Sequence, residues 1–134
     1  MNKIFFIMKT YPFENLEVWK EARQLVKMIY RLQGSFPAVE KYGLGDQLRR
    51  AVISVSSNLV EGNARYSTKE QVHFFDIAMG SLMEVYCQVL LAYDLEYLSE
   101  EQLFECKQKI ERVRILLNGL RHSKRQILKT DNLS

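Results

Sequence analysis

Residues that could hold a metal are few in this chain of 134 residues. Glu70 and His73 have the Glu-x-x-His spacing that places both side chains on one face of a helix, as di-iron bundles require. Such a site needs a second pair, and no glutamate stands three residues before His122. Glu70 also fits a helix capping box with Ser67. We therefore expect no metal, no cofactor and no catalytic residue.

Two cysteines, Cys87 and Cys106, form neither a C-x-x-C pair nor a metal-ligand spacing. Both stand in apolar helical stretches, which predicts small buried thiols in a reducing compartment. The apolar run from Ile4 to Met8 is too short for a signal peptide or a membrane span. We expect a cytoplasmic protein without membrane insertion, and Met8 is a second candidate for the start of the chain.

Charge is segregated along the last part of the chain, although the net charge is only +3. Five acids and no base occur between Asp94 and Glu105, whereas eight bases and one acid, Glu111, occur between Lys107 and Lys129. Helical spacing gathers several of these bases beside the apolar stripe. The candidate nucleic-acid contacts are Lys107, Arg114, Arg121, Lys124 and Arg125. A solvated basic face that complements the helix dipole is the structural alternative.

A polar stripe opposite the apolar face of the second predicted helix is the other candidate site. It contains Arg50, Ser54, Asn58, Glu61 and Arg65, with Arg49 beside it. Its functional interpretation is a ligand or nucleic-acid site. Its structural interpretation is a hydrogen-bonded seam or subunit interface, with Ser81 and Glu84 of the third helix as partners.

Gly80 stands inside the third predicted helix, where glycine costs up to about 1 kcal/mol relative to alanine. A close approach of another backbone would compensate this cost. The sequence therefore predicts tight helix packing at Gly80.

Four helices must position these residues. Apolar side chains at steps of three and four predict helices from near Asn15 to Gly34, from Gly45 to about Ala64, from Ser67 to about Tyr93 and from Ser99 onward. The composition, 47% hydrophobic and 26% charged, is that of a globular protein.

Connections of only a few residues favour antiparallel neighbours, so we expect an all-α, up-down-up-down four-helix bundle. The predicted organisation is an N-terminal extension over 1–12, one bundle over 13–125 and a C-terminal tail over 126–134.

A set of short motifs is distributed over most of the chain. They are Phe13-Glu14-Asn15-Leu16, Val18-Trp19, Ala22, Phe36-Pro37, Glu40, Tyr42-Gly43-Leu44, Gln47-Leu48-Arg49-Arg50-Ala51, Ser54, Asn58-Leu59-Val60-Glu61-Gly62, Arg65, Gly80-Ser81-Leu82 and Glu84. With these motifs the chain resembles the four-helix-bundle proteins of 23S ribosomal RNA intervening sequences, from about Phe13 to Leu120. Val60, where the family more often has alanine, and Asn63-Ala64 before Arg65 are mild departures.

The resemblance implies a homopentameric ring of bundles, related to accessory proteins of diversity-generating retroelements that bind nucleic acid beside a reverse transcriptase. It implies no enzymatic activity and no cofactor. We expect a non-catalytic oligomer that contacts RNA, or another nucleic acid, through the basic end of the fourth helix. The alternative is a module for self-assembly or for docking a protein partner, without nucleic-acid binding.

Overall fold

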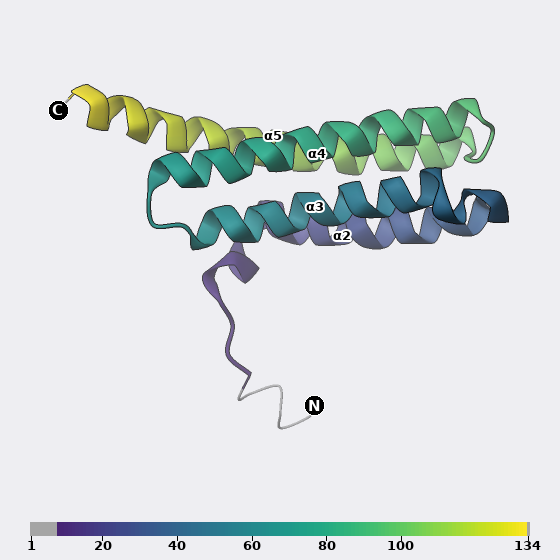
Figure 1. Cartoon of the computed structure of the whole chain (residues 1–134), viewed down its shortest axis with the longest axis horizontal. Coiled ribbons are helices and arrows are strands. Elements are labelled where there is room, and N and C mark those ends of the chain that lie inside the picture. Colours follow the sequence, from purple (N-terminus) through teal and green to yellow (C-terminus); the bar gives the residue numbers. More distant parts are fainter. Residues whose placement is uncertain (1–7, 134) are drawn as a thin grey trace.

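This computed structural model describes residues 8–133. The apolar residues at steps of three and four form four α-helices in this part of the chain, and no strand occurs there. Figure 1 shows the helices side by side. Their bounds are α2 (Glu17–Leu32), α3 (Leu44–Ala64), α4 (Thr68–Asp94) and α5 (Glu100–Leu133). Three short 3-10 helices, η1 (Pro12–Asn15), η2 (Gln33–Ser35) and η3 (Ala38–Tyr42), flank α2 or link it to α3.

Local capping signals set the starts of the last two helices. The Ser67 hydroxyl accepts a hydrogen bond from the Glu70 amide at 3.1 Å and caps α4. Ser99 and Gln102 form a reciprocal capping box at α5, with bonds of 2.9 and 3.1 Å. The first helix, predicted to start near Asn15, begins at Glu17, because Asn15 ends η1 and Leu16 occupies the N-cap of α2.

All four helices contribute to one apolar core, which fixes how they face one another. The largest fully buried side chains include Leu25, Leu59, Phe75, Leu82 and Leu117. Burial of each such side chain stabilises the fold by about 1.5–3 kcal/mol. No polar or charged residue of the described chain is buried in this core, so the polar groups predicted to act all lie at helix edges or outside.

Helix α4 is long and apolar enough to cross a membrane by length and composition, with a mean hydropathy of 1.4. Its fully buried residues Leu82, Val85 and Val89 lie in the shared core. The core position of α4 therefore accounts for part of its hydropathy. The rest comes from apolar side chains on its outer face, among them Ile77, Met83 and Leu91.

Helix α5 continues to Leu133, through the described part of the segment predicted as a tail. Its end runs past the beginning of α4 in Figure 1. The basic residues after Leu120 therefore lie on a helix that extends beyond the body of the bundle.

Candidate functional site

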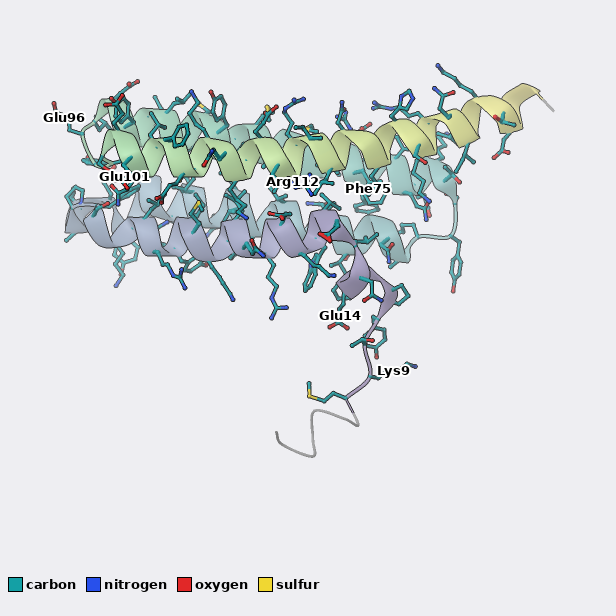
Figure 2. The ribbon with its side chains drawn as sticks, turned by 180° about the vertical axis from the view of Figure 1, so that it is seen from behind. Lys9, Glu14, Phe75, Glu96, Glu101 and Arg112 are labelled. Atoms are coloured by element: carbon teal, nitrogen blue, oxygen red, sulfur yellow. The ribbon has the colours of Figure 1, made fainter. Side chains whose placement is uncertain are left out.

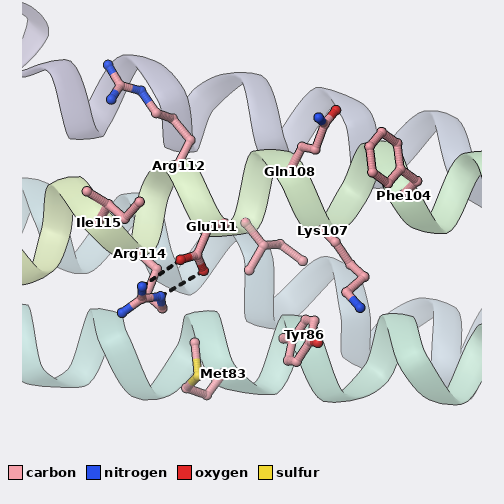
Figure 3. A pocket seen from close by; sticks show the side chains of 10 residues that line it. Met83, Tyr86, Phe104, Lys107, Gln108, Glu111, Arg112, Arg114 and Ile115 are labelled. Atoms are coloured by element: carbon pink, nitrogen blue, oxygen red, sulfur yellow. Dashed lines mark hydrogen bonds and ion pairs between the residues drawn. The ribbon is translucent and has the colours of Figure 1, made fainter.

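Bases of α5 lie along the edge that faces α4. The Lys107 ammonium is 5.9 Å from the ring centre of Tyr86 on α4, and Arg114 donates two hydrogen bonds to Glu111, one helical turn away, at 2.6 and 2.8 Å (Figure 3). The hydrogen bond from Arg114 holds the pKa of Glu111 below its ordinary value, and the same bond raises the pKa of Arg114. The side chains of Arg114 and Glu111 are 39% and 54% exposed, so this pair organises the surface rather than the core.

Two arginines near the end of α5 share one carboxylate on α4. Arg121 Nε lies 2.9 Å from Asp76 Oδ1, and an Arg125 guanidinium nitrogen lies 2.7 Å from the same oxygen. The Arg121 side chain is only 17% exposed. The shared carboxylate ties α5 to α4 at Arg121 and Arg125. Sequence reasoning missed Asp76 because it stands 45 residues before Arg121.

Positive charge remains after these pairings. Only three of the five candidate bases, Arg114, Arg121 and Arg125, pair with a carboxylate, and they use just the two of Asp76 and Glu111. Lys107 and Lys124 have no ion pair among the described residues, and Lys124 is half-buried. The arrangement can bind anionic groups along one edge of α5, mainly through these two lysines and the shared arginine pair.

The polar stripe of α3 is divided into separate contacts. The Ser54 and Ser81 hydroxyls are 2.8 Å apart and bridge α3 to α4, while Asn58 donates to the Ser54 carbonyl and hydroxyl oxygens at 2.8 and 3.0 Å. Ser81 is therefore a partner of the stripe, as predicted. Glu84 takes no part in this seam and has no ion pair among the described side chains.

The arginines of the stripe bind other groups. Arg50 pairs with Asp46 at 2.9 Å, and Arg65 pairs with Glu61 at 3.0 Å, each one turn away on α3. Arg49 donates to Gln33 and to the Lys41 carbonyl, which ties α3 to the preceding connection. Local pairing of this kind leaves no concentration of positive charge on α3.

The prediction of a close helix contact at Gly80 is wrong for the helices of this chain. A Cβ placed on Gly80 meets nothing within 4 Å, and the residue is exposed. The close approach occurs at Gly62 instead, where a Cβ would lie 2.6 Å from Phe75 Cε1. Sequence spacing could not separate the two glycines, because both stand inside helices.

One cysteine differs from its prediction. Cys106 is buried, but Cys87 is exposed on the outer side of α4. Burial raises the pKa of the Cys106 thiol to about 12, and the neighbouring Glu105 carboxylate raises it too. Within residues 8–133, no three His, Cys, Asp or Glu side chains are grouped to hold a metal ion.

A groove of about 720 Å³ lies between α4 and α5. Met83 and Tyr86 of α4 and Ile110 of α5 give it an apolar lining, and Phe104 and Ile115 also border it (Figure 3). Lys107 and Arg114 stand at its edge, so the groove and the basic edge of α5 form one continuous surface.

Four helices around one core, with short polar seams outside, define a four-helix-bundle protein. A family model described as 23S rRNA-intervening sequence protein matches residues 14–119. The chain belongs to that family, as its motifs predicted. No curated protein matches the sequence.

One solved crystal structure supports the fold. It is a protein with unknown function from the S23 ribosomal protein family of Bacteroides thetaiotaomicron, with a TM-score of 0.72 and 19% identity. The match covers 78% of this chain and 97% of that chain.

Proposed function

We propose that this protein is a non-catalytic, oligomeric scaffold of the cytoplasm that binds RNA through the basic edge of α5. One observation carries the proposal: the basic edge has more positive side chains than carboxylates to neutralise them. Two carboxylates, Asp76 and Glu111, pair with bases of this edge. The bases are Lys107, Arg114, Arg121, Lys124 and Arg125. Such an edge contacts phosphates without reading bases, and its affinity falls with salt. The end of α5 also extends beyond the bundle, where a nucleic acid can reach it.

The architecture that we propose is the antiparallel, up-down-up-down bundle. Its support comes from contacts between α4 and α5. Asp76, early in α4, meets Arg121 and Arg125 late in α5, whereas Tyr86, later in α4, meets Lys107, earlier in α5. Assembly into a homopentameric ring is proposed from the family resemblance.

RNA binding is tested with a fluorescently labelled structured RNA, titrated at several salt concentrations. The variant Lys107→Glu/Lys124→Glu removes bases that have no ion pair, so the contacts of Asp76 and Glu111 stay intact. Its affinity should fall at least tenfold, and the slope of log affinity against log salt should decrease by about two.

The matched control is Lys20→Glu/Lys41→Glu, with one change in α2 and one in η3, which changes the net charge equally. Both of its lysines are exposed and have no ion pair in the described part of the chain. Equal loss of affinity in both double variants would show a general charge effect and refute the α5 site. Absence of affinity in the unaltered protein would refute RNA binding itself.

A self-assembly module without nucleic-acid binding is the second candidate. It is favoured by the outer face of α4, where Ile77, Met83 and Leu91 are 39%, 39% and 47% exposed around the open surface of Gly80. Exposed apolar side chains on one helix face indicate a contact with another protein surface. This candidate predicts a stable oligomer whose mass is insensitive to RNA.

A further inference from the structure

The connection between α3 and α4 presents an aromatic ring to solvent. It consists of Arg65, Tyr66 and Ser67, since α3 ends at Ala64 and α4 begins at Thr68. Tyr66 has a relative exposure of 104%, so its ring is not covered by any other part of the described chain. The packing of the bundle therefore does not account for an aromatic side chain at this position.

Hydrogen bonds fix the backbone on both sides of Tyr66. The Arg65 amide donates to the Gly62 carbonyl at 3.2 Å, and the Arg65 carbonyl accepts from the Gln71 side chain at 3.0 Å. On the other side, the Ser67 carbonyl accepts from the Gln71 amide at 3.0 Å, and the Ser67 hydroxyl caps α4. The ring thus extends from an anchored backbone, which lowers the entropy cost of binding a partner there.

The Arg65 guanidinium is a second flat group beside Tyr66. Its central carbon lies 4.6 Å from the ring centre of Phe74, and one of its nitrogens donates to Glu61 at 3.0 Å. These two contacts hold the guanidinium in place, while the Arg65 side chain remains 41% exposed. Aromatic rings and guanidinium planes are the surfaces on which proteins stack unpaired RNA bases.

A hollow of about 620 Å³ lies beside these two groups. Residues on both sides of Tyr66 line it together with the first turns of α4, namely Arg65, Ser67, Lys69, Glu70, His73 and Phe74. Its volume is in the range of pockets that hold small organic molecules. Glu70 in the lining and Glu61 on Arg65 offset the positive charge, so the hollow suits a flat base better than a phosphate group.

One side of α4 connects this hollow to the basic edge of α5. Lys69, His73 and Asp76 follow at steps of four and three, which places them on one side of the helix. Asp76 binds the two arginines near the end of α5, and Lys69 lies about 10 Å before it along the helix axis. Figure 1 shows α5 extending past the connection of α3 and α4, and Figure 2 shows this end from behind, where α5 passes Phe75.

We propose that the connection of α3 and α4 stacks an unpaired base of single-stranded RNA. Tyr66 and Arg65 provide the stacking surfaces, and exposed Lys69, which has no ion pair among the described residues, contacts an adjoining phosphate. The strand continues along α4 to the bases of α5. The inference rests on the proposed RNA binding and adds the class of RNA: single strands and loops, because the bases of a duplex already stack on one another. Every base has a flat face, so the site tolerates any sequence.

Two labelled RNAs of equal length, an unstructured uridine strand and a perfect duplex, test the proposal by fluorescence anisotropy. Tyr66→Ala should weaken binding of the single strand by roughly five- to a hundredfold, because one stacked base is lost. Binding of the duplex should stay the same. The slope of log affinity against log salt should also stay the same for both RNAs, because the substitution removes no charge.

The matched control is Tyr42→Ala, which removes another exposed ring at the opposite end of α3. Tyr42 is 85% exposed and ends η3, just before α3 begins. This variant should bind both RNAs like the unaltered protein. Tyr66→Phe keeps a ring and should retain single-strand binding. Tyr66 is uncovered in the fold, so Tyr66→Ala should leave the circular dichroism spectrum and the free energy of unfolding unchanged.

Tryptophan fluorescence gives a second readout of stacking. In Tyr66→Trp, the uridine strand should quench the emission of the new indole, whereas the duplex should not. The unaltered protein is the reference, because its single tryptophan, Trp19, lies on α2 and packs against Phe13 at 5.0 Å between ring centres. Its emission should change little with either RNA.

The outcomes separate this proposal from RNA binding itself. If Tyr66→Ala binds the single strand with unaltered affinity, or loses single strand and duplex alike, base stacking is refuted while the basic edge of α5 stands. Equal losses in Tyr66→Ala and Tyr42→Ala also refute the site. If the unaltered protein binds neither RNA, both proposals fail. Loss of both RNAs in Lys107→Glu/Lys124→Glu, with selective loss of the single strand in Tyr66→Ala, supports the two together.

Discussion

At the scale of single residues, Gly62 and Gly80 have opposite environments although both stand inside helices. A Cβ on Gly62 would meet the Phe75 ring, which is 1% exposed and cannot move away. A Cβ on Gly80 would meet open space. Glycine is therefore required at Gly62 by the packing of α3 on α4, and no contact within the chain requires it at Gly80.

Gly62→Ala should lower the free energy of unfolding by about 1–3 kcal/mol, because the core must shift to admit the methyl group. Gly80→Ala should raise it by about 0.5–1 kcal/mol through better helix propensity. Urea titration followed by circular dichroism measures both. If Gly80→Ala instead destabilises the protein and dissociates an oligomer, Gly80 lies in a contact between copies.

The two thiols should also react very differently. Exposed Cys87 should be modified rapidly by a thiol reagent at pH 8, whereas Cys106 should react only after unfolding, because burial raises its pKa to about 12. Because the pKa of Cys106 is higher in the folded protein than its ordinary value of 9.0, the protonated thiol contributes to stability at pH values below 9. That contribution is lost as pH rises from about 9 towards 12.

The pH effect of Cys106 is measured as a difference. The free energy of unfolding of the unaltered protein is compared with that of Cys106→Ala at each pH, so that pH effects common to both proteins cancel. The gap between them should narrow as pH rises above 9. A gap that stays constant would show that the folded protein does not disfavour the thiolate.

At the scale of elements, the junction of α4 and α5 depends on Asp76. Its carboxylate accepts from both Arg121 and Arg125, and it is the described acid nearest to these two bases on α4. Arg121 is mostly covered, so the loss of its partner would leave a poorly solvated guanidinium. The geometry of the basic end thus depends on one residue of another helix.

Asp76→Asn should lower the free energy of unfolding by about 1 kcal/mol, since the ion pairs are partly exposed. Amide hydrogen exchange should accelerate in α5 after Leu117, while the exchange of α2 and α3 stays the same. Glu111→Gln is the control, because it removes the exposed partner of Arg114 within a single helix. Equal exchange in the two variants would argue against an anchoring role for Asp76.

At the scale of the whole molecule, the outer surfaces of α4 and α5 differ from those of an isolated globular protein. Exposed Leu91, Phe104 and Ile115 lie on these two helices, close to the basic edge. Light scattering coupled to size-exclusion chromatography should therefore give a mass above that of one chain, with five chains expected from the family resemblance. A stable monomer would refute the proposed self-assembly and weaken the multivalent RNA surface.

The sequence alone determined the helices, their core faces and the family. Helix periodicity and capping depend on residues within a few positions, which explains why the positions of Ser67, Ser99 and the apolar stripes were predictable. The motifs that identified the family are likewise local. The row of bases from Lys107 to Arg125 was visible for the same reason.

Only the tertiary structure decided which of those residues meet. Asp76 joins Arg121, Ser81 rather than Glu84 joins the polar stripe, and Gly62 rather than Gly80 receives a neighbouring side chain. Each contact joins residues of different helices, and its existence depends on the rotation and offset of one helix against another. Packing of the whole core sets this rotation and this offset, so neither can be predicted from a short stretch of sequence.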